Sequence, residues 1–159
     1  MKEIQLTKGK VALVDDEDFE VLSKRSWRLG YYNHPITYDL DCPRKTVLMH
    51  RVIMNAKKGE IIDHIDGNPL NNTRANLRFC THAENMRNQK KPKNNTSGYK
   101  GVHLNKNKKV KKWKAEIGYN KKLIFLGYFM TPEDAARSWD AAAKMIHGAF
   151  ARLNFPENK

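Results

Sequence analysis

Short runs of apolar residues alternate with polar ones over the first 49 residues, and this pattern predicts several short strands. The expected strands cover residues 4–7, 10–14, 31–33 and 36–40. A helix is expected to begin at Asp15 or Asp16, because a carboxylate suits an N-cap and the positive end of the helix dipole. Phe19, Leu22 and Trp27 follow at roughly helical spacing, which favours a place in the core.

The middle of the chain has the pattern of a strand, a loop, a second strand and a helix. The strands are expected at residues 61–64 and 77–80, joined by a loop rich in Asn and containing Gly and Pro. Thr81 is followed three residues later by Glu84, a capping-box pattern that predicts a helix running to about residue 90. Because this helix folds back after the second strand, we expect it to bring Asn85 towards Asp63.

The last third of the chain predicts three more strands, at residues 99–104, 112–119 and 123–129. In the middle strand Trp113 and Ile117 alternate with charged residues, so one face is apolar and the other is charged. A helix is expected next, with Thr131 as its cap, Pro132 in its first position and Gly148 at its end. Its small apolar stripe is expected to pack on the apolar face of the strands.

Together these elements predict the α+β class, with a ββα unit followed by a small three-stranded antiparallel sheet packed on one helix. The polar stretch at residues 89–98 has no apolar period and is expected to contain a linker. The expected divisions are an N-terminal α+β extension at residues 1–49, the ββα unit at 50–92, the linker at 93–98 and the sheet domain at 99–159.

Positive charge increases along the chain, whose net charge is +13. Residues 1–49 are neutral, residues 50–92 carry a net +4 and residues 93–159 a net +9. This distribution predicts a polyanionic partner bound mainly by the C-terminal half. Cys42 and Cys80 form no CxxC pair, so neither a zinc ribbon nor a disulfide framework is expected. The chain opens without an apolar signal region and has no run of transmembrane length, which predicts an intracellular protein.

The candidate chemistry lies in the middle of the chain. Asp63 and His64 are followed by Asn76 and Asn85, a set that can hold one divalent metal and one general base against a phosphodiester. Magnesium prefers oxygen ligands and keeps several waters, so two protein oxygens suffice. An acid at the start of the set and an amide at its end favour Mg²⁺ or Mn²⁺, one per site, over a softer metal.

The segment DHIDGNPLNNTRANLRFCTHAEN, residues 63–85, resembles the ββα-metal motif of HNH endonucleases, in the form found in phage and intron-encoded homing enzymes. The resemblance implies that Asp63 and Asn85 are metal ligands and that His64 is the general base. It also implies that Asn76 ties the loop together and orients that base. The expected products are a 5′-phosphate and a 3′-hydroxyl.

Other residues near this motif remain alternatives. His82 and Asn88 lie one turn before and one turn after Asn85, so either is an alternative third ligand. His50, in the segment LMHRV, is expected either to lie near the site or to have a local packing role, and we favour the packing role.

Residues 96–156 resemble an APETALA-type, ethylene-response-factor DNA-binding domain, on the residues SGYKGVHL, WKAEI, FLGYF, TPEDAARSWDAAAKMIHG and ARLNFP. The resemblance implies that the outer face of the sheet binds duplex DNA. Lysines stand where the plant domains tend to carry arginine, and they favour phosphate positioning over base reading. The implied contacts are His103, Lys112, Lys114, Glu116 and Phe125, and Lys106 and Lys109 are further DNA-binding candidates. Lys108 and Lys111 also stand where the plant domains tend to carry arginine.

The resulting hypothesis is a metal-dependent DNA endonuclease of the homing type, targeted by its C-terminal domain. The expected partner is double-stranded DNA, and neither a membrane nor a protein partner is expected. The enzyme is expected to be a monomer in the cytoplasm of a phage-infected bacterium. Two other classes fit the composition, a catalytically inactive DNA-binding regulator and an RNA-binding protein. The second is disfavoured because the C-terminal pattern lacks single-strand stacking motifs.

Overall fold

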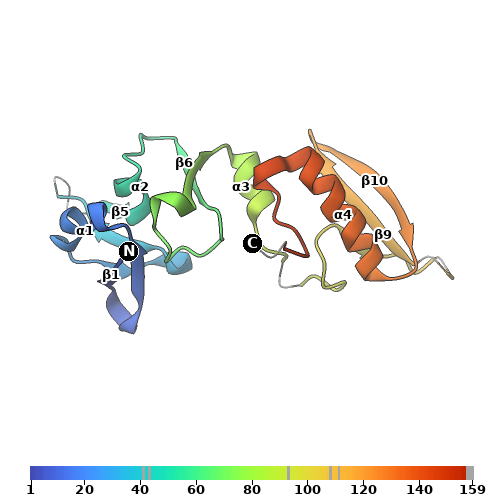
Figure 1. The fold of residues 1–159 in the computed structure, drawn as a ribbon, viewed down its shortest axis with the longest axis horizontal. Helices are drawn as coiled ribbons and strands as arrows, with labels where there is room; N and C mark the ends of the chain where they lie inside the picture. The colour runs from blue at the N-terminus through green and yellow to red at the C-terminus, as the bar shows by residue number, and fades with distance from the viewer. Residues whose placement is uncertain (41, 43, 93, 108, 111, 157–159) are drawn as a thin grey trace. The chain divides into compact units, whose positions relative to one another are not determined.

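The computed structural model describes residues 1–40, 42, 44–92, 94–107, 109–110 and 112–156. The chain divides into two compact units, Met1–Asn85 and Met86–Lys159. Small antiparallel sheets and short helices make up both units, which confirms the expected α+β class (Figure 1).

The first unit contains three small antiparallel sheets among its described residues. Two are ribbons, β1 (Lys2–Gln5) with β2 (Val11–Val14), and β6 (Ile61–His64) with β7 (Leu77–Cys80). In the third sheet β4 (Pro35–Tyr38) lies between β3 (Arg28–Leu29) and β5 (Thr46–Leu48). The helices are α1 (Asp16–Ser23), α2 (Met49–Ile53) and the start of α3 (His82–Asn88). The 3-10 turns are η1 (Thr7–Gly9), η2 (Tyr31–Asn33) and η3 (Arg74–Asn76).

One apolar core joins the elements of this unit. Leu22 of α1 and Met49 of α2 are almost completely buried in it. Ile62 of β6 and Leu77 of β7 belong to the same cluster. The β6–β7 ribbon is therefore fixed on the core by one of its faces, and this anchors the residues at the end of β6.

Beyond shifts of one or two residues at strand ends, two local predictions for the first unit differ from the structure. The helix begins as expected after Asp15 but ends at Ser23, so Trp27 lies beyond it. Trp27 is still buried, and its indole N–H donates to the carbonyl of Leu22 at 2.8 Å. The strand predicted at residues 31–33 is wrong, because these residues form the turn η2, in which Tyr32 and Asn33 have φ angles of 54° and 63°.

The second unit is a three-stranded antiparallel sheet covered by one helix. The strands β8 (Val102–Leu104), β9 (Trp113–Tyr119) and β10 (Lys122–Phe129) lie in the order β10-β9-β8. Helix α4 (Pro132–His147) runs along one face of the sheet and is followed by the 3-10 turn η4 (Gly148–Phe150) (Figure 1). Thr131 caps α4 as predicted, since its Oγ1 accepts the N–H of Asp134 at 3.1 Å. Ala115 and Ile117 of β9 are buried on the face that α4 covers.

Within the described part of the chain, none of the helices has both the length and the apolar content that crossing a bilayer requires.

Candidate active site

The residues at the end of β6 occupy opposite faces of the β6–β7 ribbon. In the register of the ribbon Asp63 pairs with Arg78, and His64 pairs with Leu77. Successive side chains of a strand point to opposite faces. His64 therefore shares a face with Ile62, the face that packs on the core, whereas Asp63 points away from it.

On its face of the ribbon Asp63 contacts Arg78. Both Nε and Nη2 of Arg78 donate to Oδ2 of the carboxylate, at 2.9 and 2.7 Å. The pair is largely withdrawn from water, with 6% of the Asp63 side chain and 16% of the Arg78 side chain exposed. The guanidinium therefore fixes the orientation of a buried carboxylate at the end of the strand.

The imidazole of His64 is buried and is held by Asn72. Nε2 of His64 lies 3.4 Å from Oδ1 of Asn72, and Asn72 itself donates from Nδ2 to the carbonyl of Pro69 at 3.0 Å. Burial lowers the pKa of His64 below its ordinary value, against the opposing effects of the Asn72 contact and of the carboxylates of Asp66 and Asp63. Burial therefore favours the neutral form of the ring, which is the form that can accept a proton.

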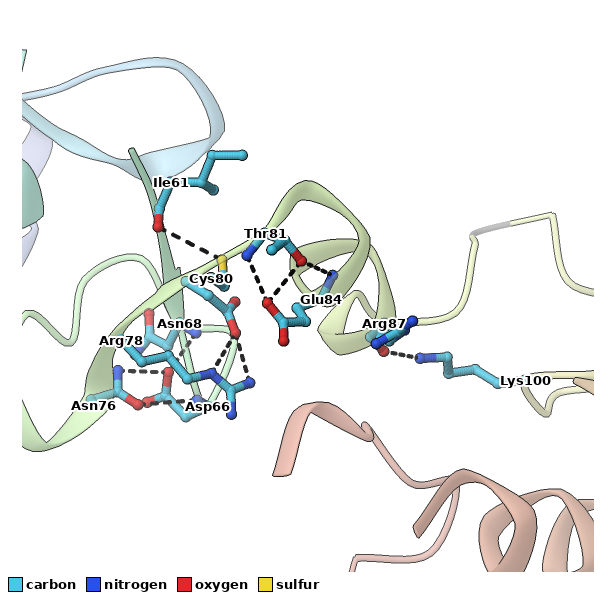
Figure 2. Close-up of polar contacts among 11 residues, drawn as sticks. Ile61, Asp66, Asn68, Asn76, Arg78, Cys80, Thr81, Glu84, Arg87 and Lys100 are labelled. Carbon is cyan, nitrogen blue, oxygen red and sulfur yellow. Dashed lines mark hydrogen bonds and ion pairs between the residues drawn. The ribbon is translucent and has the colours of Figure 1, made fainter. Parts of the chain in front are cut away.

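The loop between β6 and β7 is closed by Asn76. Its Oδ1 accepts the backbone N–H of Asp66, and its Nδ2 donates to Oδ1 of Asp66, both at 3.0 Å (Figure 2). The same Nδ2 also donates to the carbonyl of Asn71 at 2.8 Å. Burial opposes the charge of Asp66, but hydrogen bonds from Asn68, Asn71 and Asn76 outweigh it and lower its pKa. Asn76 thus ties the loop together, while the ring contact to His64 comes from Asn72.

Helix α3 begins with the predicted capping box. The N–H of Thr81 donates to Oε2 of Glu84 at 2.7 Å, and the N–H of Glu84 donates to Oγ1 of Thr81 at 3.3 Å (Figure 2). Asn85 follows directly, and its N–H donates to the carbonyl of Thr81 at 3.0 Å. The box therefore fixes Asn85 in the first turn of the helix, just after β7. Of the alternative ligands, His82 is exposed and Asn88 is buried.

Three histidines from separate elements meet on the core side of β6. His34 follows η2, His50 belongs to α2 and His64 ends β6. Their ring centroids are 5.2 Å apart for His34 and His50, 5.5 Å for His34 and His64, and 5.1 Å for His50 and His64. Burial lowers the pKa of His34 to about 4 and that of His50 to about 3, with further lowering from the neighbouring histidines. His50 thus lies beside His64, and it packs among buried residues as well.

Three residues of the site are absent from the sequence-based prediction. His34, Asn72 and Arg78 were not expected near the site. Arg78 could have been found from the strand pairing, because a residue on β7 must face Asp63. His34 could not, since it lies 30 residues before His64 in a turn whose position depends on the whole fold.

The outer face of the C-terminal sheet brings together four of the residues expected to contact DNA, His103, Lys114, Glu116 and Phe125. In the strand register His103 pairs with Lys114, and Glu116 pairs with Phe125. Glu116 accepts an ion pair from Lys114 and lies 3.8 Å from Nε2 of His103. The predicted lysines Lys106, Lys109 and Lys112 are exposed in and after the turn that follows β8. Lys108 and Lys111 lie outside the described residues.

The middle of the chain is a two-stranded antiparallel ribbon followed by a capped helix, and an Asp-His pair ends the first strand. This arrangement defines a ββα-type nuclease unit. The HNH endonuclease family profile matches residues 47–87. Over 150 residues the chain is 32% identical to an uncharacterized HNH endonuclease of Acanthamoeba polyphaga mimivirus, a match that covers 92% of this chain and 76% of that protein. The chain therefore belongs to the HNH endonuclease family and is an endonuclease.

Two further relatives match parts of the chain. It is 48% identical over 60 residues to Protein 3.8 of Escherichia phage T7, covering 38% of this chain and 48% of that protein. It is 46% identical over 61 residues to an ethylene-responsive transcription factor of Arabidopsis thaliana, covering 37% of this chain and 32% of that protein. Both resemblances noted in the sequence are confirmed. No solved structure matches the chain significantly.

Enzymes of this family generally depend on a divalent metal ion, and the chemistry of the residues in the ββα unit fits one. Asp63 and Asn85 offer a carboxylate and an amide, which are the oxygen donors that Mg²⁺ and Mn²⁺ prefer. The capping box and the pairing with Arg78 hold the elements that carry these donors. The three histidines are a separate donor set of nitrogen atoms.

Proposed function

We propose that the protein hydrolyses a phosphodiester of double-stranded DNA as a monomeric homing-type endonuclease, with His64 as general base and with Asp63 and Asn85 as ligands of one Mg²⁺ or Mn²⁺ ion. The observation that supports this most directly is the state of His64. Its ring is buried and held by Asn72, it directly follows Asp63 in β6, and burial lowers its pKa.

These properties support the role of general base. A base near neutral pH must be unprotonated and must not rotate away from the attacking water. Desolvation favours the neutral form of His64, and the contact of Nε2 with Asn72 restricts the ring. Proton acceptance by a positioned side chain contributes about 10²–10⁴-fold in rate.

Asp63 and Asn85 would bind the divalent ion from β6 and α3. When bound, such an ion supplies Lewis acidity that stabilises charge on the phosphate and on the leaving 3′ oxygen. Arg78 holds the carboxylate of Asp63 in one orientation. Asn76 closes the loop that separates the two strands and so keeps the ribbon in register.

The C-terminal sheet would hold the nuclease unit close to its target. Lys114, Glu116 and Phe125 lie together on a face that α4 leaves uncovered. A three-stranded sheet can lie in the major groove, and lysines position it on phosphates. Linking this domain to the nuclease unit raises the local concentration of DNA at the site.

The decisive test is a cleavage assay on pooled genomic DNA that includes the source genome, followed by mapping of the new ends. The full-length protein should make discrete ends with Mg²⁺ or Mn²⁺ and none with EDTA. Asp63→Asn and Asn85→Ala should both lose cleavage, whereas His147→Gln, which changes a histidine of the second unit, should keep it. Unchanged cleavage by Asp63→Asn or Asn85→Ala would refute the proposed ligands. His82→Ala and Asn88→Ala, tested beside them, show whether either alternative ligand is used instead.

A further inference from the structure

The three histidines on the core side of β6 form a cluster that the proposed reaction uses only in part. We propose that His34, His50 and His64 form a nitrogen-donor site for a borderline transition ion such as Zn²⁺, and that occupation of this site stops cleavage. Binding of the ion to the three histidines does not depend on the proposed cleavage reaction. The inhibitory effect rests on the proposed function, because a ring bound to an ion through its nitrogen cannot accept a proton.

The spacing of the rings fits one shared ion. Zinc bound by histidine has Zn–N distances of about 2.0–2.1 Å, and tetrahedral angles then place imidazole centroids about 5 Å apart. The three centroid distances are 5.2, 5.5 and 5.1 Å. One ligand nitrogen from each residue lies within 4.8 Å of the other two. Rotation of the side chains by little more than an ångström at the nitrogen atoms would bring them to the separation of about 3.4 Å that such a site requires.

Two of the rings contain buried nitrogen atoms for which the described residues offer no hydrogen bond. These atoms are Nδ1 of His34 and Nδ1 of His50. His50 is only 6% exposed, so solvent has little access to its ring. Buried polar atoms are normally satisfied by a partner, and an ion bound through Nδ1 would supply one for each ring.

Donor chemistry separates this site from the one proposed at Asp63 and Asn85. Imidazole nitrogen suits zinc, cobalt, nickel and copper, whereas magnesium requires oxygen and keeps its waters. The two donor sets lie on opposite faces of β6, because Asp63 and His64 are consecutive in the strand. Three protein ligands are the number found in zinc sites with one open position.

The binding test uses the full-length protein and the metal alone. Co²⁺ titrated into the wild type should give the visible absorption of a tetrahedral nitrogen site at one equivalent, displaced by Zn²⁺ but not by excess Mg²⁺. His34→Asn should weaken binding at least about 10-fold, the lower end of what even an outer contact to a ligand costs. His103→Asn, an exposed histidine of the second unit, is the matched control and should bind as the wild type does. Equal affinity in the wild type and His34→Asn, with both folded by circular dichroism, would overturn the site.

The inhibition test measures cleavage in saturating Mg²⁺ while Zn²⁺ is added. The wild type should stop cleaving as the histidine site fills, and His34→Asn should need at least about 10-fold more Zn²⁺. If Zn²⁺ fills the site and cleavage continues, the inhibitory role is wrong although the site exists. If the wild type never cleaves, the proposed function fails, and the Co²⁺ titration still decides the site.

Discussion

Arg78 on β7 lies directly opposite Asp63 on β6, and its Nη2 is 2.7 Å from Oδ2 of that buried carboxylate. The contact joins the two strands at the point where the candidate ligand and the candidate base leave the ribbon. It also gives this buried carboxylate a positively charged partner, without which its burial would be costly.

Replacing Arg78 should therefore destabilise the fold. Arg78→Leu leaves the carboxylate of Asp63 buried without this partner, and breaking a buried pair costs about 3–5 kcal/mol. Urea unfolding in EDTA measures the loss. Lys45→Ala removes an exposed partner of Asp39 and should cost no more than about 1 kcal/mol. Equal losses in the two variants would show that Arg78 is not needed to stabilise Asp63.

Removing the candidate base should slow the reaction without weakening binding. His64→Ala is expected to cleave about 10²–10⁴-fold more slowly than the wild type. Its affinity for the same DNA, measured in EDTA by fluorescence anisotropy, should remain within a few-fold. Wild-type rates in this variant would exclude His64 as the base, and a matching loss of affinity would indicate a binding role instead.

Asn72 should tune the pH at which His64 acts. Its contact raises the pKa of His64, so Asn72→Ala should lower that pKa further and move the acidic limb of the pH–rate profile to lower pH. Asn72→Asp places a carboxylate at the same position and should move the limb to higher pH. A purely structural role would change the rate in both variants and leave the limb where it is.

The histidine cluster should make the metal-free protein sensitive to acid. Burial lowers the pKa of His34 to about 4 and of His50 to about 3, so the folded state keeps both rings neutral while the unfolded chain takes up protons below its ordinary pKa of 6.5. Stability should therefore be complete above that pH and fall as the pH drops, by up to about 1.4 kcal/mol per pH unit for each histidine. Urea unfolding in EDTA at several pH values, compared with His50→Leu, should show a steeper fall in the wild type. Parallel curves would contradict this expectation.

The outer face of the C-terminal sheet should control DNA affinity. Lys114→Ala is expected to weaken binding and to reduce the slope of log affinity against log salt by about one phosphate contact. Phe125→Ala is expected to weaken binding without changing that slope. Lys144→Ala removes an exposed lysine of α4, outside the proposed face, and serves as the charge control. Equal effects at Lys114 and Lys144 would indicate general attraction rather than a defined face.

The elements with strong local signals could be predicted from the sequence. The β6–β7 ribbon, the capping box of α3 and the caps of α4 were expected with nearly their observed bounds, because their determinants lie within a few residues of one another. The family of the nuclease motif was also recognisable, since its spacing lies within one segment of the chain.

The remaining features depend on packing that the sequence does not display locally. The aromatic residues Tyr31 and Tyr32 are of a type common in strands, which led to the strand prediction at residues 31–33. Both side chains are exposed, and the backbone forms a turn there. The first strand of the C-terminal sheet begins at Val102 instead of residue 99, after Gly101 with its φ of 69°. A side chain at Gly101 would meet Trp139 of α4 at 2.0 Å, a constraint that appears only once helix and sheet are packed together.

The alternation of side chains along β6 makes the candidate site dependent on the number of residues within that strand. Deletion of one residue within the strand would turn Asp63 into the histidine cluster and His64 towards Arg78, although every chemical group would still be present. Deletion or insertion of two residues would leave Asp63 and His64 on their present faces of the ribbon. Related chains should therefore keep the same number of residues in this strand, or differ there by an even number. Insertions are expected instead in the turn before it, where Gly59 has a φ of 93° and a side chain would meet no atom within 4 Å.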